Sequence, residues 1–147
     1  MARILLIEDD FRLMRLYTRL LQASGYQVIP TATVTAARAM MDRYGKFDMC
    51  LSDIQVGFID PAILLAELQI IQNRFKIPVL LISSYIEKYQ DECQRLGLRY
   101  LSKSAASADL LDTIARTMAA HRFAQFGLDA TEDTARPATP KPMPDEE

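Results

Sequence analysis

Cysteine and histidine are scarce in this sequence, which limits the chemistry open to it. The 147 residues include two cysteines, Cys50 and Cys93, and one histidine, His121. Two cysteines cannot form a disulfide framework, and the spacing of a structural zinc site is absent. We interpret both as small buried apolar residues, the usual state of such cysteines in a reducing cytosol, and expect a cytoplasmic protein.

Long apolar runs and an excess of basic charge are lacking as well. No run approaches the roughly 18–20 residues of a membrane span, and acids at positions 8–10 follow the first apolar run without a signal-peptide cleavage site. The chain has 17 basic and 19 acidic side chains. Residues 122–147 contain three basic and six acidic ones, so residues 1–121 contain 14 basic and 13 acidic ones. Because that body is nearly neutral, direct binding to nucleic acid or to a membrane is not expected.

Short apolar runs alternate five times with segments of helical periodicity. Such runs are typical of strands buried in a parallel sheet, and they lie at residues 2–8, 26–29, 47–53, 77–82 and 98–102. Pro30 is expected to end the second strand. Capping residues mark the helices: Asp10, Thr33 and Asp60-Pro61 before a helix, and Gly25, Gly45 and Gly97 after one. The strict alternation predicts an α/β fold, a doubly wound parallel sheet with right-handed crossovers.

The alternation ends near residue 121, so we predict one domain over residues 1–121. An extension of the last helix to residue 126 stays open, because Phe123 and Phe126 precede Gly127. These rings either pack on the body or form a homodimer contact. Residues 127–147 contain four prolines among threonine, alanine and acids. Such a segment cannot bury enough apolar surface to offset its ordering entropy, so we predict a disordered Pro/acid-rich tail.

Polar side chains gather where four of the predicted strands end. The first strand is followed by Glu8, Asp9 and Asp10, the third ends at Asp53, the fourth is followed by Ser83 and Ser84, and the fifth by Lys103. Since the carboxyl ends of parallel strands lie at one edge of a sheet, these groups should converge there. Singly, each has an ordinary explanation: Asp10 or Asp53 could simply cap a helix or begin a turn.

Together, these groups suit phosphoryl transfer to a carboxylate. Clustered acids repel one another and are best accommodated by a hard divalent cation with oxygen ligands, such as Mg²⁺. A carboxylate at a strand end can act as the nucleophile, while a lysine and a hydroxyl stabilise the phosphoryl oxygens.

At these residues the sequence resembles the receiver domain of bacterial two-component response regulators, over about residues 2–120. The resemblance rests on Ile4 to Asp10, Phe47-Asp48 to Asp53, Pro78 to Ser84, Gly97 to Tyr100, and Lys103. It implies a flavodoxin-like, CheY-like (βα)5 fold with strand order 2-1-3-4-5. It also implies Asp53 as the phosphoacceptor, Ser83 and Tyr100 as switch residues, Lys103 as the phosphate-binding amine, and Glu8, Asp9, Asp53 and the Gln55 carbonyl as Mg²⁺ ligands.

The resemblance also implies partners. A sensor histidine kinase or a phosphotransfer protein would supply the phosphoryl group, and a downstream protein would bind the face made by the fourth helix, fifth strand and fifth helix. We expect a stand-alone receiver that signals by protein contacts, because no output domain follows. It would not be an enzyme beyond its own phosphorylation and autodephosphorylation. Gln55 and Tyr85 are expected to tune the phosphoryl lifetime, with the Tyr85 ring hindering the attacking water.

Three positions depart from the family pattern. Gly57 replaces a proline that usually stiffens the loop after the phosphoacceptor, and Asp60 replaces a glycine. The usual Lys-Pro pair, which is normally cis, is Lys103-Ser104 here. A cis bond before serine costs roughly 2.5–4 kcal/mol, so we predict a trans bond with some displacement of Lys103.

Two other classes of function compete with the phosphorylated receiver. A pseudo-receiver that signals without phosphate is motivated by Gly57 and Ser104. An aspartyl-phosphate phosphatase would need an acid where Gln55 stands, and a flavin carrier would not place three acids after its first strand. We interpret His121 as an exposed residue late in the last helix rather than as a phosphorelay histidine.

Overall fold

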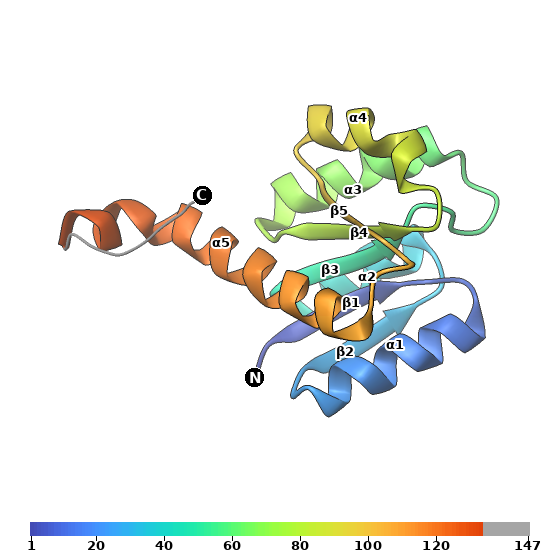
Figure 1. Ribbon diagram of the computed structural model, residues 1–147, viewed down its shortest axis with the longest axis horizontal. Coiled ribbons are helices and arrows are strands. Elements are labelled where there is room, and N and C mark those ends of the chain that lie inside the picture. The colour runs from blue at the N-terminus through green and yellow to red at the C-terminus, as the bar shows by residue number, and fades with distance from the viewer. Residues whose placement is uncertain (134–147) are drawn as a thin grey trace.

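A single parallel sheet forms the centre of the protein. The computed structural model describes residues 1–133, with five strands in the order β2-β1-β3-β4-β5 (Figure 1). The strands are β1 (Arg3–Ile7), β2 (Gln27–Thr31), β3 (Met49–Asp53), β4 (Val79–Ser83) and β5 (Arg99–Ser102). The helices are α1 (Phe11–Ala23), α2 (Val34–Tyr44), α3 (Pro61–Phe75), α4 (Ile86–Leu96) and α5 (Ser107–Asp133). The predicted flavodoxin-like architecture and strand order are confirmed.

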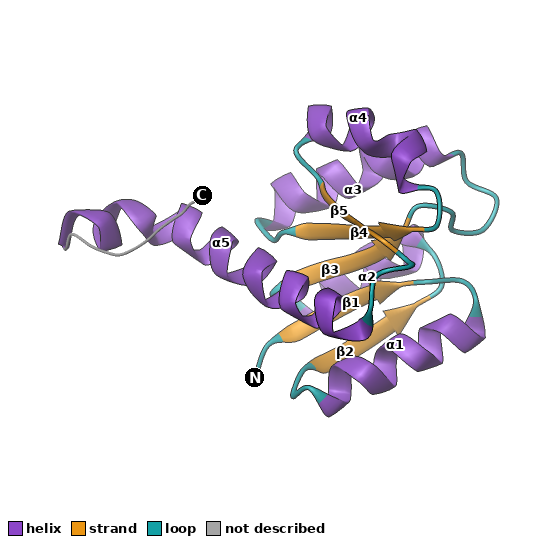
Figure 2. Ribbon diagram, in the orientation of Figure 1, coloured by secondary structure: helices purple, strands orange, loops and turns teal. Residues whose placement is uncertain are grey.

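Helices cover both faces of the sheet, as Figure 2 shows. Successive residues of a strand point to opposite faces, so Ile4 and Leu6 pack with the α1 and α5 side of the core while Leu5 and Ile7 pack with α2, α3 and α4. All four are fully buried. The continuous apolar run that predicted a strand buried on both faces is explained by these two cores. Cys50 and Cys93 are buried free thiols, also as predicted.

The predicted capping residues begin and end the helices. One carboxylate oxygen of Asp10 accepts hydrogen bonds from the backbone N–H groups of Arg12 (2.9 Å) and Leu13 (3.3 Å). Thr33 and Asp60 cap α2 and α3 in the same way. Gly97 ends α4 in the left-handed conformation that glycine adopts without strain.

Pro30 does not end the second strand. β2 continues to Thr31, and Pro30 pairs with Leu6 of β1. The prediction failed because β2 lies at the edge of the sheet, where a residue without an N–H group is tolerated. The rule that proline breaks a ladder applies to central strands.

The last helix is longer than predicted. α5 runs to Asp133, so residues 127–133 are helical rather than part of a disordered tail. An interior glycine costs only about 1 kcal/mol relative to alanine, and extending an existing helix is far easier than starting one. Gly127 therefore does not stop α5, and the first proline beyond it is Pro137. The rest of the predicted tail lies outside the described residues.

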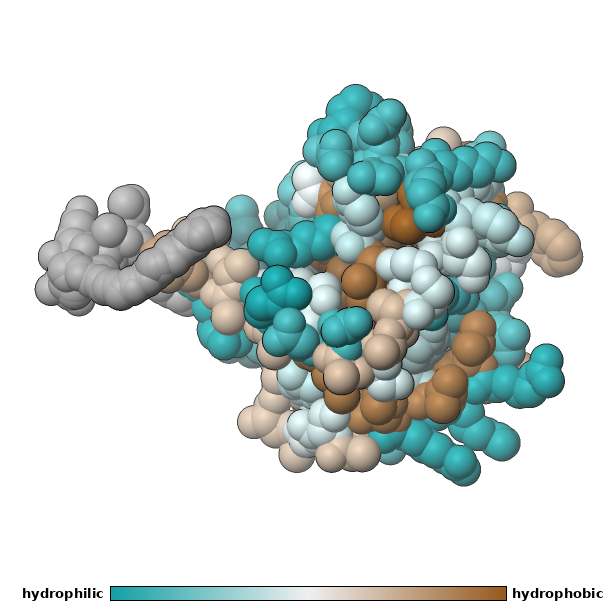
Figure 3. Space-filling view, viewed as in Figure 1, coloured by the Kyte–Doolittle hydropathy of each residue, from teal (hydrophilic) through white to brown (hydrophobic). Residues whose placement is uncertain are grey.

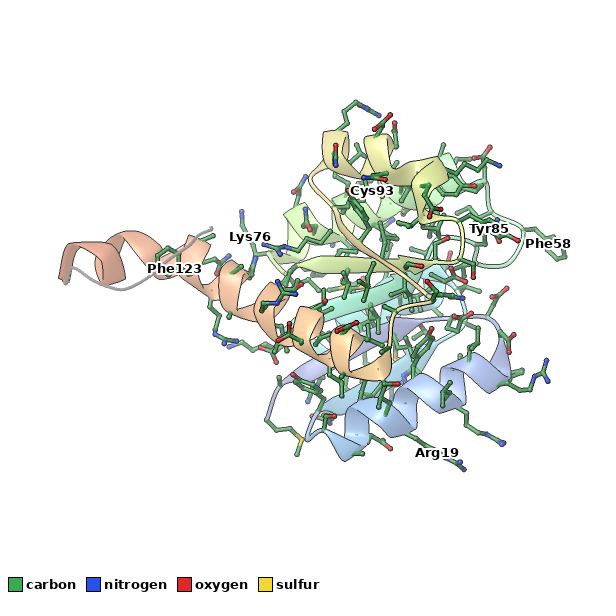
Figure 4. All side chains as sticks on the ribbon, in the orientation of Figure 1. Arg19, Phe58, Lys76, Tyr85, Cys93 and Phe123 are labelled. Carbon is green, nitrogen blue, oxygen red and sulfur yellow. The ribbon has the colours of Figure 1, made fainter. Side chains whose placement is uncertain are left out.

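α5 projects beyond the body of the protein (Figure 1). Phe123, on this projecting part, is 61% exposed (Figure 4). The alternative in which this ring packs on the body is therefore wrong. Over residues 1–133, none of the helices combines the length and the apolar character needed to cross a bilayer.

Candidate phosphoacceptor site

Four of the predicted site residues lie along one edge of the sheet. Asp53 ends β3 and Ser83 ends β4, while Glu8 directly follows β1 and Lys103 directly follows β5. Because β1, β3, β4 and β5 are neighbours in register, their carboxyl ends reach the same level. Glu8, Asp53 and Ser83 are all buried. The sequence thus located a real convergence of side chains.

Lys103 links the two buried carboxylates. Its ammonium nitrogen lies 2.9 Å from Oδ2 of Asp53 and 3.4 Å from Oε1 of Glu8. The side chains of Lys103, Asp53 and Glu8 are 15%, 10% and 1% exposed. The second carboxylate oxygen of Asp53 accepts a hydrogen bond from the backbone N–H of Ile54 at 2.7 Å. Asp53 is therefore held at both oxygens, with Oδ2 directed at the lysine.

Burial and charge act in opposite directions on these groups. Burial raises the pKa of Glu8 above its ordinary value, although the N–H of Asp10 and the charge of Lys103 oppose that rise. For Lys103, burial alone would lower the pKa, but the hydrogen bond to Asp53 and the charges of Asp53 and Glu8 outweigh it and raise the pKa. Lys103 is thus a fixed cation at neutral pH, beside two carboxylates that it cannot fully neutralise.

Asp9 joins the loop after β1 to the loop after β3. Its Oδ2 accepts a hydrogen bond from the backbone N–H of Gly57 at 2.7 Å. Gly57 adopts φ 62°, in the left-handed region. Proline could not replace it, since proline has no N–H and its ring fixes φ near −65°. The departure from the family pattern at position 57 therefore creates a contact that a proline would not allow.

The three carboxylates have the right chemistry for magnesium, but they do not lie close enough together to form a metal site. Glu8, Asp9 and Asp53 offer only oxygen donors, which suit a small hard cation. Among the side chains that the structure describes, those of residues 1–125, no three His, Cys, Asp or Glu are grouped closely enough to hold a metal ion. Asp9 is bonded to Gly57, and Glu8 and Asp53 are bonded to Lys103. A metal would need these carboxylates to move closer together than they lie here. Gln55, whose carbonyl was predicted as a ligand, lies in the same loop.

Of the two predicted switch residues, only Ser83 lies at the site. Its hydroxyl accepts a hydrogen bond from the backbone N–H of Tyr85 at 3.0 Å, and its carbonyl accepts one from Lys103 N at 3.0 Å. The half-buried Tyr100 instead accepts a hydrogen bond at its hydroxyl from the side-chain amide of Gln94 on α4 (2.9 Å). Sequence reasoning missed Gln94, since no pattern marks a glutamine that pairs across two elements.

The Lys103–Ser104 bond is trans, as predicted, since the described residues contain no cis peptide bond. Ser102 Oγ lies 2.8 Å from Ser104 Oγ and accepts a hydrogen bond from Ser104 N at 3.2 Å. These serine contacts shape the turn in place of a cis proline. Any displacement of Lys103 leaves its amine within hydrogen-bond distance of Asp53.

Two further side chains were given roles from sequence. Tyr85 is 60% exposed and lies with the fully exposed Phe58 at the carboxyl edge of the sheet (Figure 4). His121 is half-buried, and its Nε2 lies 2.7 Å from the carbonyl oxygen of Lys76, shortly before β4 begins. His121 therefore anchors α5 at the opposite edge, away from Asp53.

Comparison with known proteins points to one family. Residues 4–115 match the model of the response regulator receiver domain. The alginate biosynthesis transcriptional regulatory protein AlgB of Pseudomonas aeruginosa is 27% identical over 135 residues, which are 92% of this chain and 30% of that protein. The response regulator protein FleR of the same organism is 28% identical over 118 residues, which are 78% of this chain and 24% of that protein. The chain thus spans less than a third of these relatives.

Solved structures show the same fold. A CheY-like receiver domain protein from Methanospirillum hungatei superposes with a TM-score of 0.73 at 21% identity, over 83% of this chain and 97% of that one. A receiver domain protein from Clostridium thermocellum gives a TM-score of 0.74 at 17% identity, over 84% of this chain and 98% of that one.

Proposed function

Because the chain belongs to the response regulator receiver family, we propose that Asp53 accepts a phosphoryl group from a phosphohistidine of a sensor histidine kinase or phosphotransfer protein. The supporting observation is the buried Asp53 carboxylate, paired at 2.9 Å with Lys103. Oδ2 of Asp53 attacks the phosphorus, a P–O bond forms, and the P–N bond to histidine breaks with its electron pair leaving on the imidazole, which takes up a proton. The phosphoryl group stays on Asp53 until water removes it.

Each neighbouring group has a separate part in this transfer. The N–H of Ile54 fixes one oxygen of Asp53, so that the other is oriented for attack. Lys103 moves its hydrogen bond from Asp53 to a phosphoryl oxygen and keeps its positive charge there. The Ser83 hydroxyl donates a hydrogen bond to a second phosphoryl oxygen and gives up its contact with the N–H of Tyr85. That exchange links phosphorylation to the start of α4.

Mg²⁺ belongs to the proposal as a bound cofactor. Glu8, Asp9, Asp53 and the Gln55 carbonyl would hold it, and when bound it neutralises charge on the phosphoryl oxygens. Glu8 and Asp53 share a single lysine, so the site carries excess negative charge that a cation would balance.

A hydrophobic surface beside Lys103 suits the phosphodonor protein. A groove of about 380 Å³ lies between α1 and the loop leading into α5, and its lining includes Leu13, Leu16, Leu20 and Lys103. Figure 3 shows hydrophobic surface along α1 on this face. Docking there would bring a partner's phosphohistidine to the edge that holds Asp53.

The output is proposed to be contact with a downstream protein in the cytoplasm, on the face of α4, β5 and α5. Tyr100 and Gln94 join β5 to α4 on this face. Movement of Ser83 toward the phosphoryl group would allow the Tyr100 ring to move and to break that hydrogen bond. A homodimer contact through the exposed Phe123 ring on α5 remains a second proposal.

The deciding experiment is phosphorylation of the purified chain with Mg²⁺ and acetyl phosphate. We expect one phosphoryl group per chain and no acid-stable phosphate ester on a hydroxyl group. Peptide mapping after borohydride reduction should place the modification at Asp53. A chain that gains no phosphoryl group, or gains it at another residue, would contradict the proposal.

Replacement of Asp9 is expected to weaken the binding of Mg²⁺, so that labelling needs a higher Mg²⁺ concentration. Loss of a partner even in the outer shell of a metal site costs about 10–100-fold in affinity, so Asp9→Asn should raise the Mg²⁺ concentration for half-maximal labelling by at least about tenfold. Asp10→Asn is the matched control, because asparagine caps a helix as well as aspartate does. Equal Mg²⁺ dependence of the two variants would exclude Asp9 as a ligand.

Replacement of Tyr85 is expected to shorten the life of the phosphoryl group. An exposed ring two residues beyond Ser83 can cover the approach of water, so Tyr85→Ala should speed dephosphorylation by about threefold to tenfold, a barrier change near 1 kcal/mol. The decay is followed after removal of acetyl phosphate. Tyr85→Phe, which keeps the ring, should decay like the parent chain, and an unchanged rate in Tyr85→Ala would refute the shielding role.

A further inference from the structure

A groove opens at the edge of the sheet opposite Asp53. It has a volume of about 690 Å³ and lies between the α2–β3 connection, the α3–β4 connection and α5. Figure 4 labels Lys76 beside the middle of α5 on this side, far from Tyr85 and Phe58 at the carboxyl edge. None of the residues proposed for phosphoryl transfer lines this groove.

The lining combines aromatic rings with positive charge. Its rings are Tyr44, Phe47 and Phe75, and its cations are Lys46, Lys76 and Arg122. Among the side chains described, those of residues 1–125, no carboxylate forms an ion pair with any of these three cations. The single acid in the lining is Asp48, and its Oδ2 accepts a hydrogen bond from the backbone N–H of Arg3 at 2.8 Å.

Arg3 adds a further cation at the rim. Its guanidinium carbon lies 5.9 Å from the centre of the Tyr44 ring and 5.6 Å from that of Phe47. It also donates a hydrogen bond to the carbonyl of Lys46 at 3.2 Å. Phe47 is buried, so the exposed Tyr44 and the half-buried Phe75 offer the ring contacts for an apolar, proline-containing segment. The cations suit carboxylates.

The sequence of the same chain contains a segment of that chemistry. Residues 141–147 read Lys-Pro-Met-Pro-Asp-Glu-Glu, with two prolines and a methionine followed by three acids. We propose that this segment docks in the groove of its own chain, with Pro142, Met143 and Pro144 against the rings and Asp145 to Glu147 beside the cations. Prolines lower the entropy that is lost when such a segment becomes ordered.

The chain is long enough for this contact. Gln125 lines the groove, and α5 continues from there to Asp133, a rise of about 12 Å at 1.5 Å per residue. Residues 134–140 span roughly 22–25 Å when extended, at 3.1–3.6 Å per residue. That length covers the return to the groove. A short tether of this kind gives an effective concentration in the millimolar range, which favours the segment of the same chain over that of a second copy.

Paramagnetic relaxation in the full chain tests the contact. Thr139→Cys places a nitroxide label just before the docking segment and leaves residues 141–147 unchanged. Cys50 and Cys93 are fully buried, and burial raises the pKa of the Cys50 thiol to about 12, so the introduced thiol reacts selectively. We expect amides of residues 44–48, 75–77 and 121–125 to lose most of their signal, while amides of residues 53–58 keep theirs.

Paired charge reversals provide the control. Lys46→Glu/Lys76→Glu should abolish the signal loss at the groove, because it replaces two cations with anions that repel the acidic segment. The turns should keep their shape, since the contacts of these two residues there use backbone atoms. Arg12→Glu/Arg19→Glu on α1 makes the same change in net charge away from the groove and should leave the signal loss intact. No selective loss at the groove, or equal results for the two variants, would overturn the proposal. So would signal loss that arises only between spin-labelled and isotope-labelled molecules in a mixture, since that would place the segment on a second copy.

Discussion

Asp53→Asn is expected to abolish phosphoryl incorporation from acetyl phosphate and Mg²⁺. The amide has no anionic oxygen to attack phosphorus, and it adds a donor group where the carboxylate faced Lys103 at 2.9 Å. Its carbonyl oxygen can still accept the hydrogen bond from the N–H of Ile54, so the end of β3 should keep its shape. The measurement is the amount of acid-labile or base-labile phosphoryl group per chain, which should fall to background.

A matched variant separates chemistry from folding. Asp91→Asn makes the same substitution on the exposed face of α4, and it should be labelled like the parent chain. Both variants should unfold in urea with ordinary cooperativity, which shows that the sheet is intact. Substantial labelling of Asp53→Asn would mean that another group is the acceptor, and the proposed roles of Lys103 and Ser83 would fail with it.

The positions of the site residues followed from a single topological rule. Glu8, Asp53, Ser83 and Lys103 are far apart in sequence, but each closes a strand of a parallel sheet, and the carboxyl ends of such strands share an edge. Buried apolar runs and capping residues are local signals, so they could be recognised without knowledge of tertiary contacts. Convergence of the four side chains then required only the strand order.

The contacts that sequence could not predict join residues through tertiary structure. Asp9 bonds to Gly57 across 48 residues, and nothing in the sequence fixes the direction in which an exposed aspartate turns. Tyr100 bonds to Gln94 rather than toward Ser83 for a similar reason. The missing proline at position 57 was visible in the sequence, but its consequence, a free N–H for Asp9, depended on the shape of the loop.

Errors at element ends have an energetic origin. Pro30 and Gly127 are both residues that disfavour regular structure, and each was expected to end an element. The cost of either residue is a few kcal/mol at most and depends on its position. At an edge strand, or within a helix that already exists, neighbouring residues outweigh that cost. Local propensity therefore located the elements correctly and their limits less well.

Loss of Lys103 should lower both the stability of the fold and the rate of phosphorylation. Lys103→Met keeps an unbranched stem but leaves Glu8, 1% exposed, and Asp53 without their shared cation. Removing one partner of a buried ion pair costs about 3–5 kcal/mol, and the partial exposure of Lys103 reduces this to about 2–3 kcal/mol at neutral pH. Labelling from acetyl phosphate should fall at least about 100-fold, the scale seen when one charge-stabilising donor is removed.

The pH dependence identifies the cause of that loss. The pKa of Glu8 is already raised above 4.5 by burial, and Lys103 opposes the rise, so Lys103→Met must raise it further. Between the ordinary value and the raised pKa, the folded state binds more protons than the unfolded state, and stability falls as pH increases. Relative to the parent chain, the free energy of unfolding in urea should therefore fall a little near about pH 5 and much more near about pH 8. Adding Glu8→Gln should recover most of the stability lost near about pH 8. A deficit equal at both pH values would instead point to lost packing of the lysine stem, and the unpaired charge of Glu8 would not be its cause.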